Sequence, residues 1–143
     1  MDQKQKASIS KDEIIKGDCP VYSLCAEDDL MIIFAGLENG KIVIYHNWYN
    51  GGYIPRQTIS AHQMPIYNME YDQKNSFLIS GVIGEGVRIW KNEQKRYVFH
   101  QEIQGPAPGI NLFYINSDAN LLFTSIFDKG IVIWKLQENS KYE

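Results

Sequence analysis

The sequence predicts an all-β protein built from internal repeats, and two observations carry this prediction. First, Ile, Val, Thr, Tyr, Phe and Trp together supply 45 of the 143 residues, whereas Ala and Leu supply only 14. β-Branched and aromatic side chains suit a half-buried pleated surface, while Ala and Leu favour helices. Second, one alternating apolar pattern ending in an aromatic residue occurs three times, as GKIVIYH, EGVRIWK and KGIVIWK.

The three copies share one period. Their closing aromatic residues, Tyr45, Trp90 and Trp134, are 45 and 44 residues apart. Three further landmarks keep the same offsets: Phe34-Ala35-Gly36 with Ile79-Ser80-Gly81 and Phe123-Thr124-Ser125; Pro20-Val21-Tyr22 with Pro65-Ile66-Tyr67 and Gly109-Ile110-Asn111; and Ile14 with Ile59 and Ile103. Agreement at four landmarks establishes a repeat of 44 or 45 residues.

Each copy holds four short apolar stretches separated by turn residues. In the second copy they cover residues 54–59, 66–71, 77–81 and 87–91, with turns over 72–76 and 84–86. Four such strands form one small antiparallel sheet, a blade, which must stack on neighbours to bury both faces. In chain order we expect a flexible tail over 1–8, three blades over 9–136 (9–60, 61–104 and 105–136 by repeat) and a polar tail over 137–143.

This pattern resembles the WD-repeat β-propeller family over roughly residues 9–136. A repeat of that family opens with Gly-His, carries Ser-Gly-x-x-Asp-Gly before its last strand, and closes with Trp-Asp. The second copy has Ala61-His62, Ser80-Gly81 and Trp90, and the third has Thr124-Ser125, Asp128 and Trp134. The closing Asp is replaced in all three copies, by His46, Lys91 and Lys135.

The resemblance implies that a His, a Ser or Thr, an Asp and a Trp brace each blade through hydrogen bonds. The candidate bracing residues are His62, Ser80 and Trp90 in the second blade, and Thr124, Asp128 and Trp134 in the third. No copy holds all four types, because Gly84 stands where the second copy should have its Asp, and the third copy lacks the His.

Three blades leave the architecture incomplete, since propellers usually have four to eight. A family repeat starts with the outer strand of the preceding blade, so residues 9–15 are expected to form an outer strand without a blade of their own. Three arrangements stay open: a two-fold, six-bladed dimer in which each N-terminal strand pairs with residues 130–136 of the other copy, a partner chain with further blades, or a fragment of a longer WD-repeat protein.

Two sets of residues are candidate partner contacts. Apolar residues occupy the turns between the second and third inner strands, where the family usually has small polar ones; they are Leu37, Val82, Ile83, Ile126 and Phe127. On the opposite face, the loop 46–53 offers an aromatic anchor of Trp48, Tyr49 and Tyr53. Grouped exposed apolar residues indicate a binding surface, and local packing is the alternative for both sets.

No motif predicts catalysis, a cofactor or a metal site. The sequence has no Gly-rich phosphate loop before a helix, no Gly-x-Ser-x-Gly and no helical His-Glu-x-x-His, and its three histidines are scattered. A net charge of −3 without a basic cluster argues against nucleic-acid binding. An apolar run of at most about six residues argues against a membrane span. With no apolar N-terminal signal and two cysteines expected to stay reduced, we expect a cytoplasmic protein.

The sequence therefore favours a non-enzymatic protein-interaction scaffold that binds a partner protein or a second copy of itself. The alternative is a small-molecule binder or enzyme using the channel of a closed propeller. That function needs converging polar residues at the channel. The inner strands over 21–26, 66–71 and 110–115 are mainly apolar, with Tyr22, Asn68 and Asn111 among their residues, which favours the scaffold.

Overall fold

The computed structural model describes residues 14–29, 31–48, 52–105 and 109–143, and within them all regular structure is β-strand. The first sheet comprises β1 (Val21–Glu27), β2 (Ile32–Leu37), β3 (Lys41–Trp48) and β4 (Gly52–Ser60). The second comprises β5 (Asn68–Asp72), β6 (Phe77–Val82), β7 (Gly86–Glu93) and β8 (Arg96–Ile103). The third comprises β9 (Ile110–Asn116), β10 (Leu121–Ile126) and β11 (Gly130–Lys135). The prediction of an all-β protein with antiparallel blades is confirmed: two of these sheets have four strands and the third has three.

Each sheet is a meander in which every strand pairs with the next one along the chain. Tight turns make this possible, and Gly40 shows why the residue type matters. Its φ of +79° lies in the left-handed region, and an added Cβ would stand 2.0 Å from the carbonyl oxygen of His62. Only glycine fits this close approach between the β2–β3 turn and the linker that enters the second blade.

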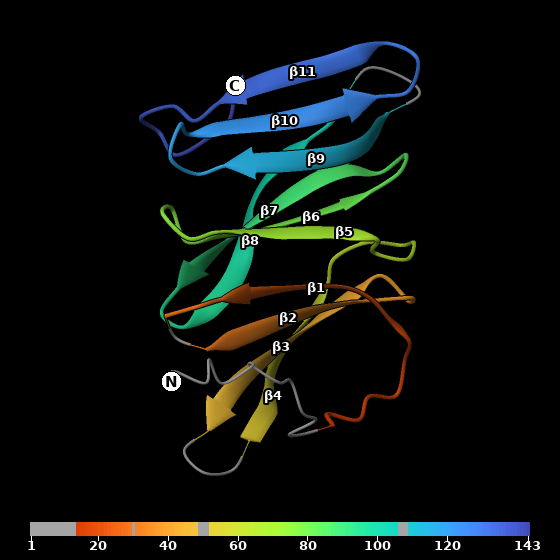
Figure 1. Ribbon diagram of the computed structural model, residues 1–143, viewed down its shortest axis with the longest axis vertical. Coiled ribbons are helices and arrows are strands. Elements are labelled where there is room, and N and C mark those ends of the chain that lie inside the picture. Colours follow the sequence, from red (N-terminus) through yellow and green to blue (C-terminus); the bar gives the residue numbers. More distant parts are fainter. Residues whose placement is uncertain (1–13, 30, 49–51, 106–108) are drawn as a thin grey trace, which may run out of the picture.

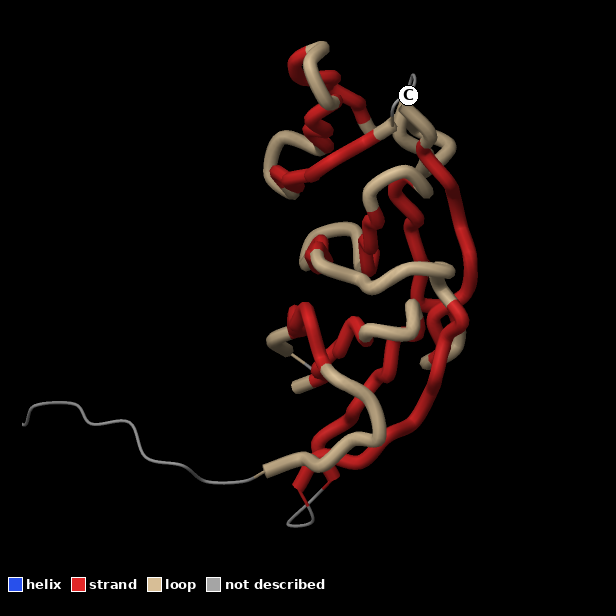
Figure 2. The backbone as a smooth tube through the Cα atoms, turned by 90° about the vertical axis from the view of Figure 1, so that its right-hand side faces the viewer, coloured by secondary structure: helices blue, strands red, loops and turns tan. Residues whose placement is uncertain are grey.

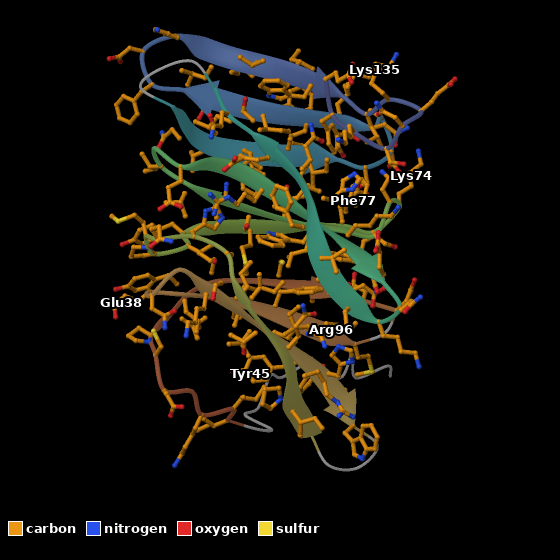
Figure 3. The ribbon with its side chains drawn as sticks, turned by 180° about the vertical axis from the view of Figure 1, so that it is seen from behind. Glu38, Tyr45, Lys74, Phe77, Arg96 and Lys135 are labelled. Carbon is orange, nitrogen blue, oxygen red and sulfur yellow. The ribbon has the colours of Figure 1, made fainter. Side chains whose placement is uncertain are left out.

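The three sheets stack face to face and fan into an arc (Figures 1 and 2). The first strands of the blades lie next to one another, because β1 contacts β5 and β5 contacts β9. The outer strands β4 and β8 lie on the other side of the stack, in the foreground of Figure 3. The β2–β3, β6–β7 and β10–β11 turns all lie at one end of the stack, along the right-hand edge of Figure 1.

Two apolar layers between the sheets form the core. The first layer is made by Ile32, Phe34, Ile42, Ile44 and Ile59 of the first blade with Ile66, Met69, Leu78, Trp90 and Tyr97 of the second. The second layer is made by Phe77, Ile79, Val87, Ile89 and Ile103 of the second blade with Ile110, Phe113, Ile115, Leu122 and Tyr142 of the third. Equivalent positions of consecutive repeats therefore pack in the same way at the two interfaces. At each interface, one face of a blade packs on the opposite face of the next blade.

A glutamine–tyrosine clamp joins each pair of neighbouring blades at their outer strands. Gln57 of β4 donates to the carbonyl of Tyr97 (2.7 Å) and accepts from its N–H (2.9 Å). Gln101 of β8 does the same to Tyr142, with 2.7 Å and 2.9 Å. Each amide side chain satisfies a main-chain donor and acceptor at the free edge of the next sheet, where no further strand pairs.

The C-terminal segment is more than a polar tail. Tyr142 is buried, packs against Phe77, and donates from its hydroxyl to Asp72 (3.3 Å). Leu136 forms a bridge with Tyr142, and the main chains of Lys135 and Glu143 exchange two hydrogen bonds. Residues 141–143 therefore begin the outer strand of the third blade along the edge of β11.

The outer strand expected over residues 9–15 is not formed by the residues of that range that the structure describes. Ile14 and Ile15 lie outside any strand, and residues 9–13 fall outside the described part of the chain. The segment 14–19 instead runs along the open face of the first sheet, where it borders a groove of about 990 Å³. With no strand before it to pair with, the first sheet begins at β1 in the residues that the structure describes.

Replacing Gln57 tests the clamp. Gln57→Glu keeps the shape of the side chain but removes the donor to the Tyr97 carbonyl, so we expect the free energy of unfolding in urea to fall by about 1–2 kcal/mol. The matched control is Gln104→Glu, because Gln104 is exposed and follows the equivalent strand β8. Equal effects of the two changes would show that the clamp contributes nothing.

Candidate protein-interaction surface

A buried polar network braces the second blade. Ser80, on β6, accepts a hydrogen bond from Trp90 Nε1 (3.0 Å) and lies 2.9 Å from His62 Nε2. All three side chains are buried, and His62 reaches the site from the linker that precedes β5. The network therefore ties the linker to the two central strands of the blade.

Glu85 completes this network, and the sequence motif did not identify it. His62 Nδ1 lies 3.2 Å from Glu85 Oε2, and the N–H of Gln63 donates to both carboxylate oxygens (3.1 Å each). The family pattern places an Asp at position 84, but this chain has glycine there, with a φ of +86°. A glutamate one residue later, with one more methylene, reaches the same histidine.

The electrostatics of His62 favour its neutral form. Burial lowers the pKa of His62, the nearby Arg88 lowers it further, and the hydrogen bond to Glu85 acts in the opposite direction. Arg88 is itself held by Glu102, 3.0 Å away, and by the carbonyl of Ala61. A neutral imidazole can donate to Glu85 and accept from Ser80, which matches the geometry.

The third blade has a shorter network. Trp134 Nε1 donates to Thr124 Oγ1 at 2.8 Å. Asp128 does not join them: it is exposed in the β10–β11 turn, with a φ of +58°. The structure thus brings together His62, Ser80 and Trp90, and separately Thr124 and Trp134, but leaves Asp128 apart.

The bracing network should make stability depend on pH. Because the folded-state pKa of His62 lies below that of the unfolded chain, the unfolded state binds the proton first as pH falls below about 6.5. The free energy of unfolding should therefore be fully retained above that pH and decrease as pH falls below about 6.5. Urea titrations across this range measure the slope.

His62→Gln should flatten this pH dependence more than His46→Gln does, because burial lowers the pKa of both imidazoles and His46 is the less buried of the two. An unchanged slope in His62→Gln would contradict the assignment.

The turns at one end of the stack only partly present the expected apolar residues. Ile83 and Phe127 are 59% and 52% exposed, but Leu37, Val82 and Ile126 are buried. The three buried residues are the last ones of β2, β6 and β10 and still belong to the sheets. Val82 packs between the first two blades, whereas Leu37 borders the groove of the first sheet. Only the following residue in each turn faces outward.

Other exposed residues extend this surface. Tyr22 and Tyr67, the residues at the entries of the first and second blades, stack with ring centroids 5.0 Å apart. Tyr67 is 65% exposed, and the neighbouring linker exposes Met64. The hydroxyl of Tyr22 donates to Glu38 (3.2 Å), which raises the pKa of Tyr22. We call the set Tyr22, Tyr67, Met64, Ile83, Phe127 and Glu38 the loop face.

The sequence held one signal for the stacked pair. Tyr22 and Tyr67 occupy the same position of consecutive repeats, 45 residues apart, and stacked blades bring equivalent positions side by side. Exposed stacked tyrosines beside a carboxylate suit an apolar or cationic side chain of a partner.

At the opposite end of the stack, the structure does not bring Trp48 and Tyr53 of the expected aromatic anchor together. Trp48 is exposed, and the guanidinium of Arg56 lies 4.7 Å from the centre of its ring. Tyr53 is partly buried and lines the groove of the first sheet, together with Tyr45, which Figure 3 labels. Tyr49 falls outside the described residues. Trp48 and Tyr53 therefore belong to different environments.

Comparisons with known proteins agree with this architecture. No family model matches the chain. Transducin beta-like protein 3 of Rattus norvegicus is 24% identical over 126 residues, and that of Bos taurus is 25% identical over the same length. Two solved structures, "Structure of U3-55K" and "Crystal structure of RRP9 WD40 repeats", match with TM-scores of 0.69 and 0.68 at 15% identity. The fold is that of the WD-repeat β-propeller family.

The matches cover most of this chain and little of the relatives. They span 86% of the chain but 15% of the curated relatives, and 90% of the chain but 39% of the solved structures. In the part of the WD-repeat chain that the structure describes, no helix is long and apolar enough to cross a membrane, and no three His, Cys, Asp or Glu residues gather as metal ligands.

Proposed function

We propose that this WD-repeat chain is a non-enzymatic protein-interaction scaffold, a partial propeller whose open blade faces are covered by further blades from a second copy or a partner chain. The observation that carries this proposal is the contrast between internal and terminal blade faces. Ile44 and Ile89 are fully buried between blades, whereas Ile133, at the equivalent position of the third blade, is 60% exposed.

The open face of the third blade is broadly apolar. Leu112, Tyr114, Ile131 and Ile133 are all exposed there, on β9 and β11. Across β10, Phe123 pairs with Tyr114 on one side and with Ile133 on the other, so these side chains share one face. Contiguous exposed apolar surface of this kind favours an interface.

The residues of the loop face support a scaffold role in a second way. An exposed tyrosine stack with a neighbouring carboxylate and apolar turns offers contacts of the type enriched at protein interfaces. The hollow beside it, about 270 Å³, is lined mainly by glycines, and its carboxylate, Glu85, is already bonded to His62 and Gln63. These features favour protein contact over catalysis at this end.

Light scattering coupled to size exclusion tests coverage of the open faces. The purified chain should form species heavier than 16.5 kDa, and Ile133→Asp should shift them toward the monomer because it places a charge on the open face. The matched control is Ile83→Asp, since Ile83 is equally exposed but lies on the loop face. A stable, folded wild-type monomer near 16.5 kDa would contradict the proposal.

The loop face is tested separately. Tyr67→Ala should weaken binding to a captured partner protein by at least about 1–2 kcal/mol while leaving the unfolding curve nearly unchanged, as expected for an exposed aromatic contact. Tyr114→Ala, a similarly exposed tyrosine on the open blade face, is the control for this surface. If Tyr67→Ala and the wild type bind equally, the loop face is not the binding surface.

A further inference from the structure

The clamp between neighbouring blades has a third, unfilled position. Tyr97 pairs with Asn92 at the start of β8, and Tyr142 bridges Leu136 at the start of the third outer strand. Tyr53 pairs with Asn47 at the start of β4, in the same register. The three tyrosines are 44 and 45 residues apart, so they are one position of the repeat.

Tyr53 differs from its two equivalents because, among the described residues, no blade covers it and no glutamine holds its main chain. Tyr97 and Tyr142 are 3% and 2% exposed, because the preceding blade covers them and a glutamine holds their main chain. Tyr53 is only partly buried and lines the groove of the first sheet. Among the described residues, no side chain bonds to its main chain.

We propose that this groove is the docking site of a further β-propeller blade, supplied by a partner polypeptide, whose outer strand carries a glutamine for Tyr53. The glutamine donates to the Tyr53 carbonyl and accepts from the Tyr53 N–H, as Gln57 and Gln101 do at the two internal interfaces. This inference rests on the proposed function and names the chemistry of the partner that covers the first blade.

The internal interfaces also describe the apolar face that the partner needs. The blade that precedes the second blade presents Phe34, Ile42 and Ile44, and the blade that precedes the third presents Ile79, Val87 and Ile89. The first blade offers Ile33, Val43 and Tyr45 to receive such a face. A blade with three aliphatic or aromatic residues on its two central strands therefore fits the groove.

A second copy of residues 1–143 does not supply this glutamine. Within residues 1–143 the glutamines at this position are Gln57 and Gln101, and each already holds a tyrosine of the next blade. Upstream of β1, the alignment of Ile14 with Ile59 and Ile103 places Asp12 at that position. A carboxylate can accept from the Tyr53 N–H but has no proton to donate to its carbonyl.

A tethered blade tests the proposal on residues 15–143. Residues 61–103, which carry Gln101, are duplicated and joined to residue 15, because Ile103 aligns with Ile14. The probe is this extension, compared with the same extension carrying Gln101→Leu in the added copy only. Amide hydrogen exchange of Tyr53, measured by NMR, reports whether its N–H is held.

We expect the glutamine extension to slow exchange of the Tyr53 amide by about tenfold relative to the leucine extension, since one protected hydrogen bond is gained. Exchange at Tyr97 and Tyr142 should be equal in both proteins. Equal Tyr53 exchange in the two extensions would overturn the proposal. So would a dimer of the unextended chain in which Tyr53 is as protected as Tyr97, because the occupant would then be a second copy.

A second extension guards against misfolding of the first. If circular dichroism shows that the first extension is unfolded, the copy of residues 15–59 replaces it, with Gln57 as the clamp and Ile59 aligned with Ile14. Failure of both extensions to fold overturns the proposal. Neither result depends on the loop face or on Ile133, so failure here is distinguishable from failure of the proposed function.

Discussion

The fold depends on face-to-face packing between consecutive sheets. A four-stranded sheet of this length has two apolar faces and cannot bury either one by itself, so each blade is stabilised by the blades that it touches. The second blade has neighbours on both sides, and its β6 is buried along its whole length. Among the residues that the structure describes, the first and third blades each have one face without a neighbouring blade.

Side-chain hydrogen bonds stabilise this stacking. The network of His62, Ser80, Trp90 and Glu85 fixes the linker that leads from one blade to the next. Asn68 and Glu70 of β5 hydrogen-bond to the main chain of β9, at 3.2 Å and 2.7 Å, which sets how the third blade lies on the second. Burial also raises the pKa of the Cys25 thiol to about 12, so it packs between blades as a neutral side chain.

Much of the fold could be predicted from the sequence because the repeat imposes one pattern three times. Tyr45, Trp90 and Trp134 mark the third strand of each blade, and four landmarks with one period leave little freedom in the alignment. The C-terminal strand start was missed because residues 137–143 are mostly polar. The spacing of Tyr53, Tyr97 and Tyr142 carried that information, but it is visible only once the tyrosines are compared across repeats.

The candidate surface was harder to predict because exposure at a strand end depends on a shift of a single residue. Val82 and Ile83 are adjacent and both apolar, yet one is buried and the other exposed, because β6 ends at Val82 and Ile83 lies in the turn that follows. The sequence motif also missed Glu85 by a single position. A carboxylate braces His62, but it comes from the next position along the turn.

Amide hydrogen exchange tests the central claim most directly, measured on the chain diluted until further copies no longer cover its open blade faces. If neighbouring blades stabilise one another, the slowest exchange should lie in β6, with β2 and β10 exchanging faster because each of their blades lacks one neighbour. Equally slow exchange in β2, β6 and β10 would contradict the account, since it would mean that a blade covered on one face is as stable as a blade covered on both.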